Sequence, residues 1–384
     1  MPSDTPLTVM HLAPGHWAGH MRIYHRECMT LLEAGYKVEL IAHRLPQEQL
    51  DTRLRLHSLG VYGAPSLAWR MLQRARRNQR AYALSRHANV ALYHYHSPEF
   101  IAWGRRLRRL SGRPVIFDCM EDFEGYMRQR RGVPTILRGP LTEIVRRQLH
   151  AAARSCDAVI VADQGTAKLL RPYARRLLVL HNFPQLSLFP APCPPLTHQP
   201  FDVVYHGTVP KYHLEVCLAV DKLLVERGYH IHWRFIGEVS EQDWLTGELT
   251  HRGIQARFHI SGLIPHNQIA QEISRAKIGI IPLPSLPKFH NNIPQKLFEF
   301  MALGMPVVLS DLPPSRPFVG DGVCAFMVPP KDYGAYADAI IRLLNNPTLR
   351  RQMGAEGQRR IEQEYNWEKE SQKLIDLYRE LLGT

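Results

Sequence analysis

The segment 291–311, with the sequence NNIPQKLFEFMALGMPVVLSD, decides which fold we expect. Asn292 is a residue type that caps helices, Pro294 suits a first helical turn, and Gly304 suits a helix end. Apolar runs before and after this helix predict two buried strands, so the order is strand, loop, helix, strand. In a parallel-sheet unit of this kind, ligands bind at the carboxyl ends of the strands, where they face helix N-termini.

Two charged residues of the predicted helix lie on one face, three positions apart. Lys296 would add a full positive charge to the helix dipole, which favours a bound diphosphate. Glu299 can accept hydrogen bonds from sugar hydroxyls. The same spacing also fits an ordinary surface Lys–Glu pair, so the spacing alone leaves both interpretations open.

A family resemblance favours the first interpretation. The pattern Pro294-x-Lys296-x-Phe298-Glu299-x-Met301-Ala302-x-Gly304-x-Pro306-Val307 resembles the donor-site motif of retaining family 4 glycosyltransferases, enzymes of the GT-B fold that use nucleotide sugars. Residues 22–42 resemble the opening helix and second strand of that family, and Tyr365-Asn-Trp-Glu368 resembles the start of its final helix. These motifs occur in the order of the family, and the resemblance covers nearly the whole chain.

The chain length and the strand pattern predict two α/β domains. A chain of 384 residues is too long for one ordinary core. Short apolar strand candidates alternate with helical segments in both halves, which is typical of parallel sheets wrapped by helices. In the first half they are residues 8–12, 37–42, 90–95, 115–118, 158–161 and 177–180, and in the second half 201–207, 231–236, 256–260, 277–281 and 306–309.

The resemblance implies a GT-B architecture, in which two Rossmann-like domains face a central cleft. We expect an acceptor domain over residues 1–183 and a donor domain over residues 201–365. The proline-dense stretch 184–200 predicts a linker, because it cannot continue a helix or a central strand. The final helix, 366–384, is expected to cross back and pack on the first domain.

Composition limits the class of protein. Hydrophobic residues make up 45% of the chain, and no apolar run approaches the ~20 residues that span a bilayer. The first residues show no secretory signal, and six cysteines without metal-binding spacing suit reduced thiols. We therefore expect a cytoplasmic protein with no metal site and no cofactor other than a nucleotide sugar as substrate.

Positive charge is concentrated in the first half. Residues 1–190 carry 28 Lys and Arg against 14 Asp and Glu, whereas the net charge of residues 191–384 is −1. In Arg70–Arg86 and Arg105–Arg113, arginines alternate with apolar residues in a helical pattern, which fits peripheral binding to anionic lipid on the inner face of the plasma membrane. A solvated surface is the alternative, and no nucleic-acid-binding motif accompanies the charge.

Donor-side residues are predicted from strand ends in the second half. Gly207 follows a strand and allows close approach of a phosphate, which Lys211 would neutralise. Gly237 ends a second strand. The segment with Ile264 resembles the family segment whose backbone meets the donor base, and Asn292 completes the predicted donor set with Lys296 and Glu299.

Acceptor-side residues are predicted from the first half. Gly15 and His16 follow the first strand, and Arg22 is a candidate for positioning a phosphate or carboxylate. His94 and His96 close another strand and point to the same face, so we expect them at the acceptor site, with His96 in a catalytic role.

The sequence departs from the family pattern in two places. Many relatives carry Asp-x-His-Glu at the strand end that reads Asp118-Cys-Met120-Glu121 here, so Met120 replaces a histidine that assists at the sugar, and Glu121 remains as a catalytic candidate. The family motif has two glutamates eight positions apart, and the first falls on Asn291. Asn291 still hydrogen-bonds a hydroxyl but supplies no negative charge to an oxocarbenium ion.

We therefore predict a metal-independent, retaining hexosyltransferase. It would use a nucleotide sugar and a glycan or lipid-linked acceptor in the synthesis of cell-surface polysaccharide or glycoconjugate. Two alternatives stay open. A nucleotide-sugar epimerase shares the fold and would turn over the donor without an acceptor. A non-catalytic glycosyltransferase-like subunit would bind the donor without transfer, and Met120 with Asn291 favours it.

Overall fold

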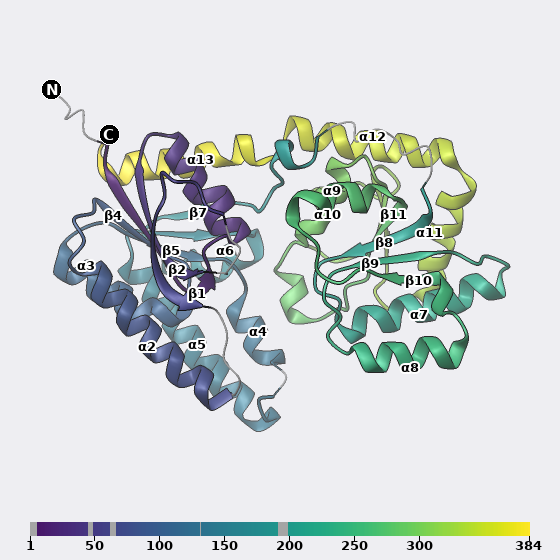
Figure 1. The fold of residues 1–384 in the computed structure, drawn as a ribbon, viewed down its shortest axis with the longest axis horizontal. Coiled ribbons are helices and arrows are strands. Elements are labelled where there is room, and N and C mark those ends of the chain that lie inside the picture. The colour runs from purple at the N-terminus through teal and green to yellow at the C-terminus, as the bar shows by residue number, and fades with distance from the viewer. Residues whose placement is uncertain (1–5, 45–48, 62–66, 131, 191–198) are drawn as a thin grey trace. The chain divides into compact units, whose positions relative to one another are not determined.

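The computed structural model describes residues 6–44, 49–61, 67–130, 132–190 and 199–384 (Figure 1). The chain divides into two compact units. The first unit comprises Met1–Asn182 together with Lys369–Thr384, and the second comprises Phe183–Glu368. Each unit is built around its own parallel sheet.

In the described part of the first unit, seven parallel strands form a sheet in the order β3-β2-β1-β4-β5-β6-β7. The strands are β1 (Thr8–Trp17), β2 (Lys37–Arg44), β3 (Arg55–Val61), β4 (Leu92–Tyr95), β5 (Val115–Cys119), β6 (Ala158–Val161) and β7 (Leu177–Val179). The helical elements are η1 (Met21–Cys28), α1 (Met29–Glu33), α2 (Leu67–Ser85), η2 (Pro98–Phe100), α3 (Ile101–Ser111), α4 (Phe123–Gln129), α5 (Thr135–Ser155) and α6 (Gln164–Leu170).

Strand alternation assigns the side chains of the first sheet to its two faces. Met10 and Leu12 of β1 join the apolar core with Tyr93 and Tyr95 of β4, and helices α2, α3 and α5 contribute to the same core. The residues between them point to the opposite face. His11 therefore lies beside its register partner on β4, His94, so this face of the sheet is polar at its centre.

The second unit has a six-stranded parallel sheet within its described residues, in the order β10-β9-β8-β11-β12-β13. The strands are β8 (Phe201–His206), β9 (Trp233–Ile236), β10 (Phe258–Ile260), β11 (Ala276–Ile281), β12 (Val307–Ser310) and β13 (Ala325–Val328). The helical elements are η3 (Leu186–Leu188), α7 (Lys211–Glu226), α8 (Gln242–Arg252), η4 (Gln255–Arg257), α9 (His266–Ser274), η5 (Pro287–His290), α10 (Gln295–Ala302), α11 (Tyr333–Asn345) and α12 (Pro347–Gln363). The prediction of two Rossmann-like α/β domains is confirmed.

The start of α10 differs from the sequence prediction. Pro294 occupies the N-cap position and Gln295 is the first helical residue, so Asn292 lies too early to cap the helix. The predicted end is confirmed, because Gly304 follows the helix with φ 63° and donates its N–H to the carbonyl of Met301 at 3.0 Å. A left-handed residue at this point lets the chain turn directly into β12.

The predicted linker lies partly outside the described residues, since residues 191–198 are among those that the structure leaves undescribed. The described residues at the start of this stretch are packed against the second unit, unlike those of a flexible linker. Phe183 and Phe189 are buried in the core of the second unit, and Phe183 packs edge-on against Phe298 with ring centroids 4.8 Å apart. Apolar side chains thus tie this stretch to the second unit.

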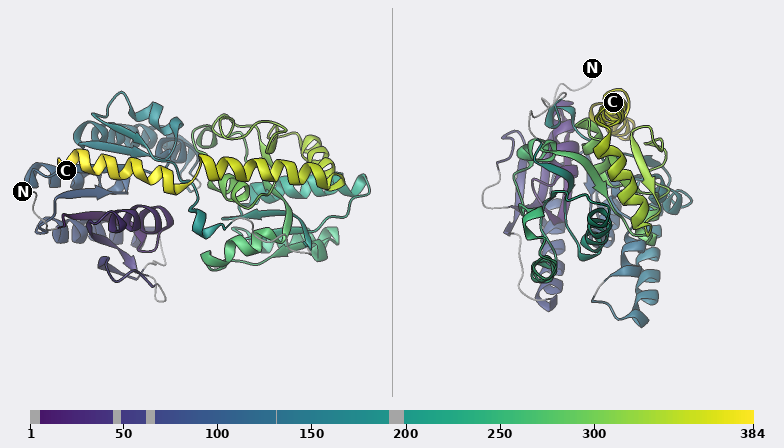
Figure 2. Two further views of the ribbon diagram at one scale, coloured as in Figure 1. Left: turned by 90° about the horizontal axis from the view of Figure 1, so that it is seen from above. Right: turned by 90° about the vertical axis from the view of Figure 1, so that its right-hand side faces the viewer.

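The last helix, α13 (Trp367–Leu382), begins in the second unit and belongs to the first unit from Lys369 onward (Figure 2). The buried Tyr378 anchors it there, because its hydroxyl hydrogen-bonds His94 Nδ1 at 2.8 Å and His11 Nε2 at 3.1 Å. The return of the chain to the first unit follows from these contacts.

Two further observations concern membrane-spanning helices and the pairing of the cysteines. No helix within the described ranges combines the length and the apolar character needed to cross a bilayer. Cys193 lies outside the described residues, and the five cysteines inside them are buried and unpaired, namely Cys28, Cys119, Cys156, Cys217 and Cys324.

Candidate functional site

Two glycines of the second unit bring the ends of β8 and β9 into contact. Gly207 follows β8 with φ 94°, and Gly237 follows β9 with φ 136°. A Cβ on Gly237 would lie 2.1 Å from the carbonyl oxygen of Gly207. Only glycine fits this approach, so the carboxyl ends of the two strands present bare backbone, as the sequence predicted.

Lys296 of α10 lies beside this bare backbone. Its Nζ is 3.8 Å from the centroid of the Tyr205 ring and would be 3.4 Å from a Cβ on Gly207. Burial lowers the pKa of Lys296 to about 7, although Glu299 acts in the opposite direction. The ammonium thus sits on an aromatic face at the strand end, where a bound anion would favour its protonated form.

Glu299 lies one turn further along α10 and contacts a histidine that the sequence analysis left without a role. His206, the last residue of β8, places Nε2 3.1 Å from Glu299 Oε2, and both side chains are largely buried. The His206 ring meets Phe300 edge-on, with centroids 5.0 Å apart. The Glu299 carboxylate therefore lies beside the carboxyl end of β8, against the His206 ring.

The remaining donor candidates lie on neighbouring loops. The N–H of Gly237 donates to the carbonyl of Gly262 at 2.8 Å, which places the segment leading to Ile264 beside the β9 end, and Ile264 itself packs partly on the core. Asn291, which was predicted as a catalytic rather than a donor-binding residue, follows η5 and is partly buried. The side-chain oxygen of Asn292 is buried and accepts no hydrogen bond from any described residue.

Lys211 is oriented differently from the prediction. It is the first residue of α7, and its Nζ lies 4.4 Å from the centroid of the Trp244 ring and 3.9 Å from Glu215. Its backbone N–H donates to Glu241 at 3.2 Å. These contacts hold the lysine against α8, so a role at a phosphate requires a change of its rotamer.

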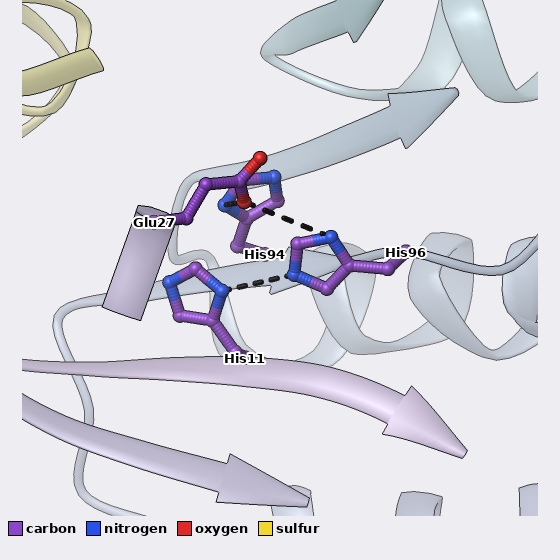
Figure 3. Close-up of side chains that lie close together, drawn as sticks. All are labelled: His11, Glu27, His94 and His96. Atoms are coloured by element: carbon purple, nitrogen blue, oxygen red, sulfur yellow. Dashed lines mark hydrogen bonds and ion pairs between the residues drawn. The ribbon is translucent and has the colours of Figure 1, made fainter. Parts of the chain in front are cut away.

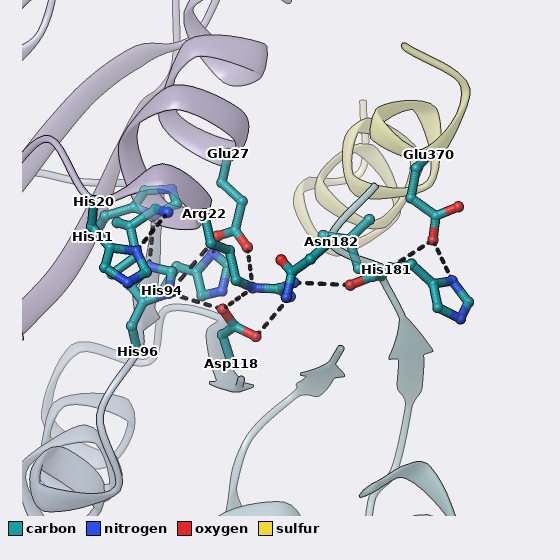
Figure 4. Close-up of polar contacts among 12 residues, drawn as sticks. His11, His20, Arg22, Glu27, His94, His96, Asp118, His181, Asn182 and Glu370 are labelled. Atoms are coloured by element: carbon teal, nitrogen blue, oxygen red, sulfur yellow. Dashed lines mark hydrogen bonds and ion pairs between the residues drawn. The ribbon is translucent and has the colours of Figure 1, made fainter. Parts of the chain in front are cut away.

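In the first unit, Arg22 has a different role from the predicted one (Figure 4). Its Nε and Nη2 donate to Asp118 at 2.8 and 2.9 Å, and Nη1 donates to the carbonyl of Leu180 at 2.9 Å and to Asn182 at 2.8 Å. Burial alone would lower the pKa of Arg22, but Asp118 and Glu27 raise it above its ordinary value. The guanidinium is fully engaged inside the unit and is not available to an acceptor.

His94 and His96 also differ from the prediction, because both are buried rather than facing an acceptor. His96 Nε2 lies 2.9 Å from His11 Nδ1, and its Nδ1 lies 3.1 Å from Asp118. Burial and the neighbouring histidines lower the pKa of both rings well below the ordinary value. A buried, neutral His96 in this network does not act on an acceptor hydroxyl in the present conformation.

The other acceptor-side candidates lie near the end of β1. A Cβ on Gly15 would come within 2.9 Å of Ser97 Oγ, so β1 closely approaches the segment after β4 here. His16 is partly buried, which lowers its pKa, and the charges of Asp118 and Glu121 act in the opposite direction. Glu121 is exposed just beyond β5. His16 and Glu121 thus remain as polar groups at this edge of the first sheet.

The second unit therefore brings together groups whose chemistry would suit a nucleotide diphosphate. Bare backbone at two strand ends and a lysine suit phosphate oxygens, and a positioned carboxylate suits a diol. The sequence had placed Gly207, Gly237, Lys296 and Glu299 at this edge of the sheet. It did not predict the contact of His206, because a place at a strand end indicates the edge of the sheet but not the partner, Glu299.

Both halves of the chain match known families. Residues 197–360 match the family model described as Glycosyl transferases group 1, and residues 19–188 match the one described as Glycosyltransferase Family 4. The two matches follow one another along the chain. They leave unmatched only the two ends and a short stretch between them.

Individual curated relatives align over part of their length. The alpha-D-kanosaminyltransferase of Streptomyces kanamyceticus is 26% identical over 158 residues, which is 41% of this chain and 40% of the relative. The phosphatidyl-myo-inositol mannosyltransferase of Mycobacterium leprae is 38% identical over 82 residues, 21% of this chain and 22% of the relative. The chain thus spans two fifths or less of these two relatives.

Solved structures resemble the whole chain. Sucrose-phosphate synthase from Thermosynechococcus elongatus superposes with a TM-score of 0.79 and 19% identity, covering 98% of this chain and 99% of that one. Anabaena HepE, solved in complex with UDP and glucose, superposes with a TM-score of 0.70 and 15% identity, covering 97% and 100%. At these identities the likeness concerns the fold.

Proposed function

Because the chain belongs to family 4 of the glycosyltransferases, which have the GT-B fold, we propose that it transfers a hexose from a nucleotide sugar with retention of configuration. The acceptor is a glycan or a lipid-linked sugar in the synthesis of cell-surface polysaccharide or glycoconjugate. One observation carries the proposal: Lys296, the bare backbone of Gly207 and Gly237, and the His206–Glu299 pair meet at the carboxyl edge of one parallel sheet.

The proposed chemistry needs no metal ion at the donor. Lys296 and the backbone N–H groups at the strand ends stabilise the diphosphate leaving group as its charge develops. Glu299, beside the His206 ring, binds the ribose hydroxyls. The acceptor hydroxyl attacks from the side of the departing phosphate and gives its proton to that phosphate. No strong protein base is then required, which is consistent with the buried His96 and with Met120.

Binding of nucleotide sugars tests the proposal directly. We propose a UDP-sugar as the first candidate, since the structurally similar HepE was solved with UDP and with UDP-glucose. A ligand that binds only the folded state at 100 times its Kd adds about 2.7 kcal/mol of stability, so thermal unfolding with UDP, GDP, ADP and CMP sugars should identify one donor by a raised Tm.

The outcome also separates the alternatives. Donor turnover that needs an added acceptor supports the transferase, whereas interconversion of the donor alone indicates the epimerase. Binding without either reaction indicates a non-catalytic subunit. If no nucleotide sugar raises the Tm, the donor site proposed for the second unit is wrong.

The first unit has an exposed basic surface that could bind a membrane carrying the acceptor. The two basic stretches form helices α2 and α3, and the Arg70 side chain lies outside the described residues. Arginines with exposed side chains remain on both helices or directly after them, namely Arg74, Arg76, Arg80, Arg86, Arg105, Arg106, Arg109 and Arg113. Leu110 is 69% exposed beside them, and Ile136 at the start of α5 is 85% exposed. We propose that this surface binds anionic lipid on the inner face of the plasma membrane.

Sedimentation with liposomes measures this binding. We expect recovery with anionic vesicles at low salt and its loss at high salt, because the Debye length falls to about 8 Å at physiological ionic strength. Replacing both Arg76 and Arg80 by glutamine should weaken binding by roughly 2 kcal/mol, or about thirtyfold, since each basic residue near the surface contributes about 1 kcal/mol.

A matched change in the second unit serves as the control. Arg351→Gln removes an exposed charge from α12 and should leave liposome recovery unchanged. Equal recovery with neutral and anionic vesicles, or no recovery with either, would leave a protein partner or a soluble acceptor as the explanation of the basic surface.

A further inference from the structure

We propose that His11, Glu27, His94 and His96 form a binding site for a first-row divalent metal ion such as Zn²⁺ in the first unit (Figure 3). One ligand atom from each of the four side chains lies within 4.8 Å of all the others. The inference is independent of the donor site, whose residues belong to the second unit.

The fold brings the four side chains together for local reasons. His11 and His94 are register partners on the adjacent parallel strands β1 and β4, and His96 lies two residues beyond His94 on the same face. Glu27 reaches this face from η1, which packs over the sheet (Figure 3). All four side chains are fully buried.

Several polar atoms of the cluster lack hydrogen bonds. Glu27 Oε1 forms an ion pair with Arg22, but neither oxygen of Glu27 accepts a hydrogen bond from the described residues, and His94 Nε2 has no such partner either. Leaving a buried polar group unsatisfied costs about 1–3 kcal/mol, and more for a charged one. A metal ion would bind the lone pairs that the protein leaves unused.

Residues outside the cluster orient its three imidazole rings, as hydrogen-bond partners orient the ligands of a metal ion. One nitrogen of each imidazole is held from outside: Asp118 contacts His96 Nδ1, and the Tyr378 hydroxyl contacts His94 Nδ1 and His11 Nε2. Of the second nitrogens, His94 Nε2 has no hydrogen-bond partner among the described residues. The other two, His11 Nδ1 and His96 Nε2, hydrogen-bond one another at 2.9 Å, and a bound ion would replace this bond.

The two oxygens of the Glu27 carboxylate also have different neighbours. Glu27 Oε1 pairs with Arg22 Nε at 3.0 Å, while Oε2 lies 3.9 Å from His94 Nδ1 and 3.8 Å from His96 Nδ1, the nitrogens that Tyr378 and Asp118 also contact. Arg22 is itself held by Asp118, so these two opposite charges offset each other. A tetrahedral ion with bonds of ~2.0–2.1 Å needs ligand atoms ~3.3 Å apart, which side-chain shifts of roughly 1 Å would provide.

Two further features fit a metal site. η1 is a π-helix, a rare conformation that often accompanies functional side chains, and it carries Glu27. His16 and His20 are only partly buried, and their rings lie 4.8 Å apart at the end of β1. His16 also hydrogen-bonds the backbone of His96, so these two histidines adjoin the cluster.

Metal content of the purified protein tests the proposal. After incubation with Zn²⁺ and extensive dialysis, we expect one tightly held ion per chain. Glu27→Gln and His94→Gln should each reduce affinity for Zn²⁺ by at least roughly tenfold, and Tyr378→Phe, which removes an outer contact, by roughly 10–100-fold. The control is the double variant His232→Gln/His259→Gln, which removes an exposed histidine pair of the second unit and should change nothing.

Measurements on the unaltered protein decide the question if a core variant fails to fold. Co²⁺ bound at the cluster should give the intense visible absorption of a four-coordinate ion, and a chelator should lower the Tm of the metal-loaded protein. Less than stoichiometric retention of Zn²⁺, the weak absorption of six-coordinate Co²⁺, or loss of metal only in the His232/His259 variant would overturn the proposal.

Discussion

Replacing Glu299 or Lys296 by alanine is expected to weaken donor binding at least tenfold while the protein stays folded. Each side chain lies at the strand-end site of the second unit and makes its contacts at the edge of the sheet. Loss of a charge-assisted hydrogen bond costs roughly 1.5–3 kcal/mol. Calorimetric titration with the donor that the thermal screen identifies gives the Kd of each variant.

Glu226→Ala is the matched control for the glutamate. Glu226 lies on α7 of the same unit, with its side chain 54% exposed in a surface pair with Lys222. Its removal should leave the Kd unchanged. Wild-type affinity in either the Glu299 or the Lys296 variant would show that the donor binds elsewhere.

The same titration should depend on pH through Lys296. Its pKa of about 7 means that the free protein holds this lysine mostly neutral above pH 7, whereas a bound diphosphate favours the protonated form. Binding above pH 7 then requires proton uptake, so the affinity should fall by up to about tenfold per pH unit. Lys296→Arg should remove this decline, because guanidinium stays protonated.

Replacing Arg22 by alanine is expected to destabilise the first unit by about 3–5 kcal/mol. The change would leave Asp118 and Glu27 as buried carboxylates without their cation. Arg22→Lys should recover part of the loss, since an ammonium keeps the charge but not the bidentate geometry. Urea unfolding followed by circular dichroism gives the change in the free energy of unfolding.

Arg128→Ala provides the comparison for this prediction. Arg128 pairs with Glu124 on the surface of α4, with its side chain 55% exposed, and its loss should cost no more than about 0.5 kcal/mol. If Arg22→Ala and Arg128→Ala destabilise the protein equally, the buried ion pair is not what holds the first unit together.

The order of helices and strands could be predicted from short stretches of sequence. Buried strands of β-branched residues and the alternating helices follow from short-range periodicity, and the structure has strands at each predicted range. Two strands were missed, β3 (Arg55–Val61) and β13 (Ala325–Val328). Both lie at sheet edges, where fewer side chains are buried and the apolar signal is therefore weaker.

The positions of the residues that we propose as the donor site were also predictable, because local structure defines them. In any parallel sheet, a glycine that follows a strand and charged residues in the first turns of the next helix lie at the carboxyl edge of the sheet. Lys296 and Glu299 therefore lie where the sequence placed them. The neighbour of Glu299 was not predictable in this way, since His206 is far from it in the chain.

The sequence by itself determined the two parallel-sheet units and the strand ends that carry the proposed donor residues, because periodicity and turn chemistry act between near neighbours. Only the tertiary structure decided the roles of Arg22, His94 and His96. Arg22 meets Asp118 across 96 residues, and His94 meets Tyr378 across 284. Whether a polar side chain is buried with such a partner or faces a ligand depends on how distant segments pack, and no local pattern contains that information.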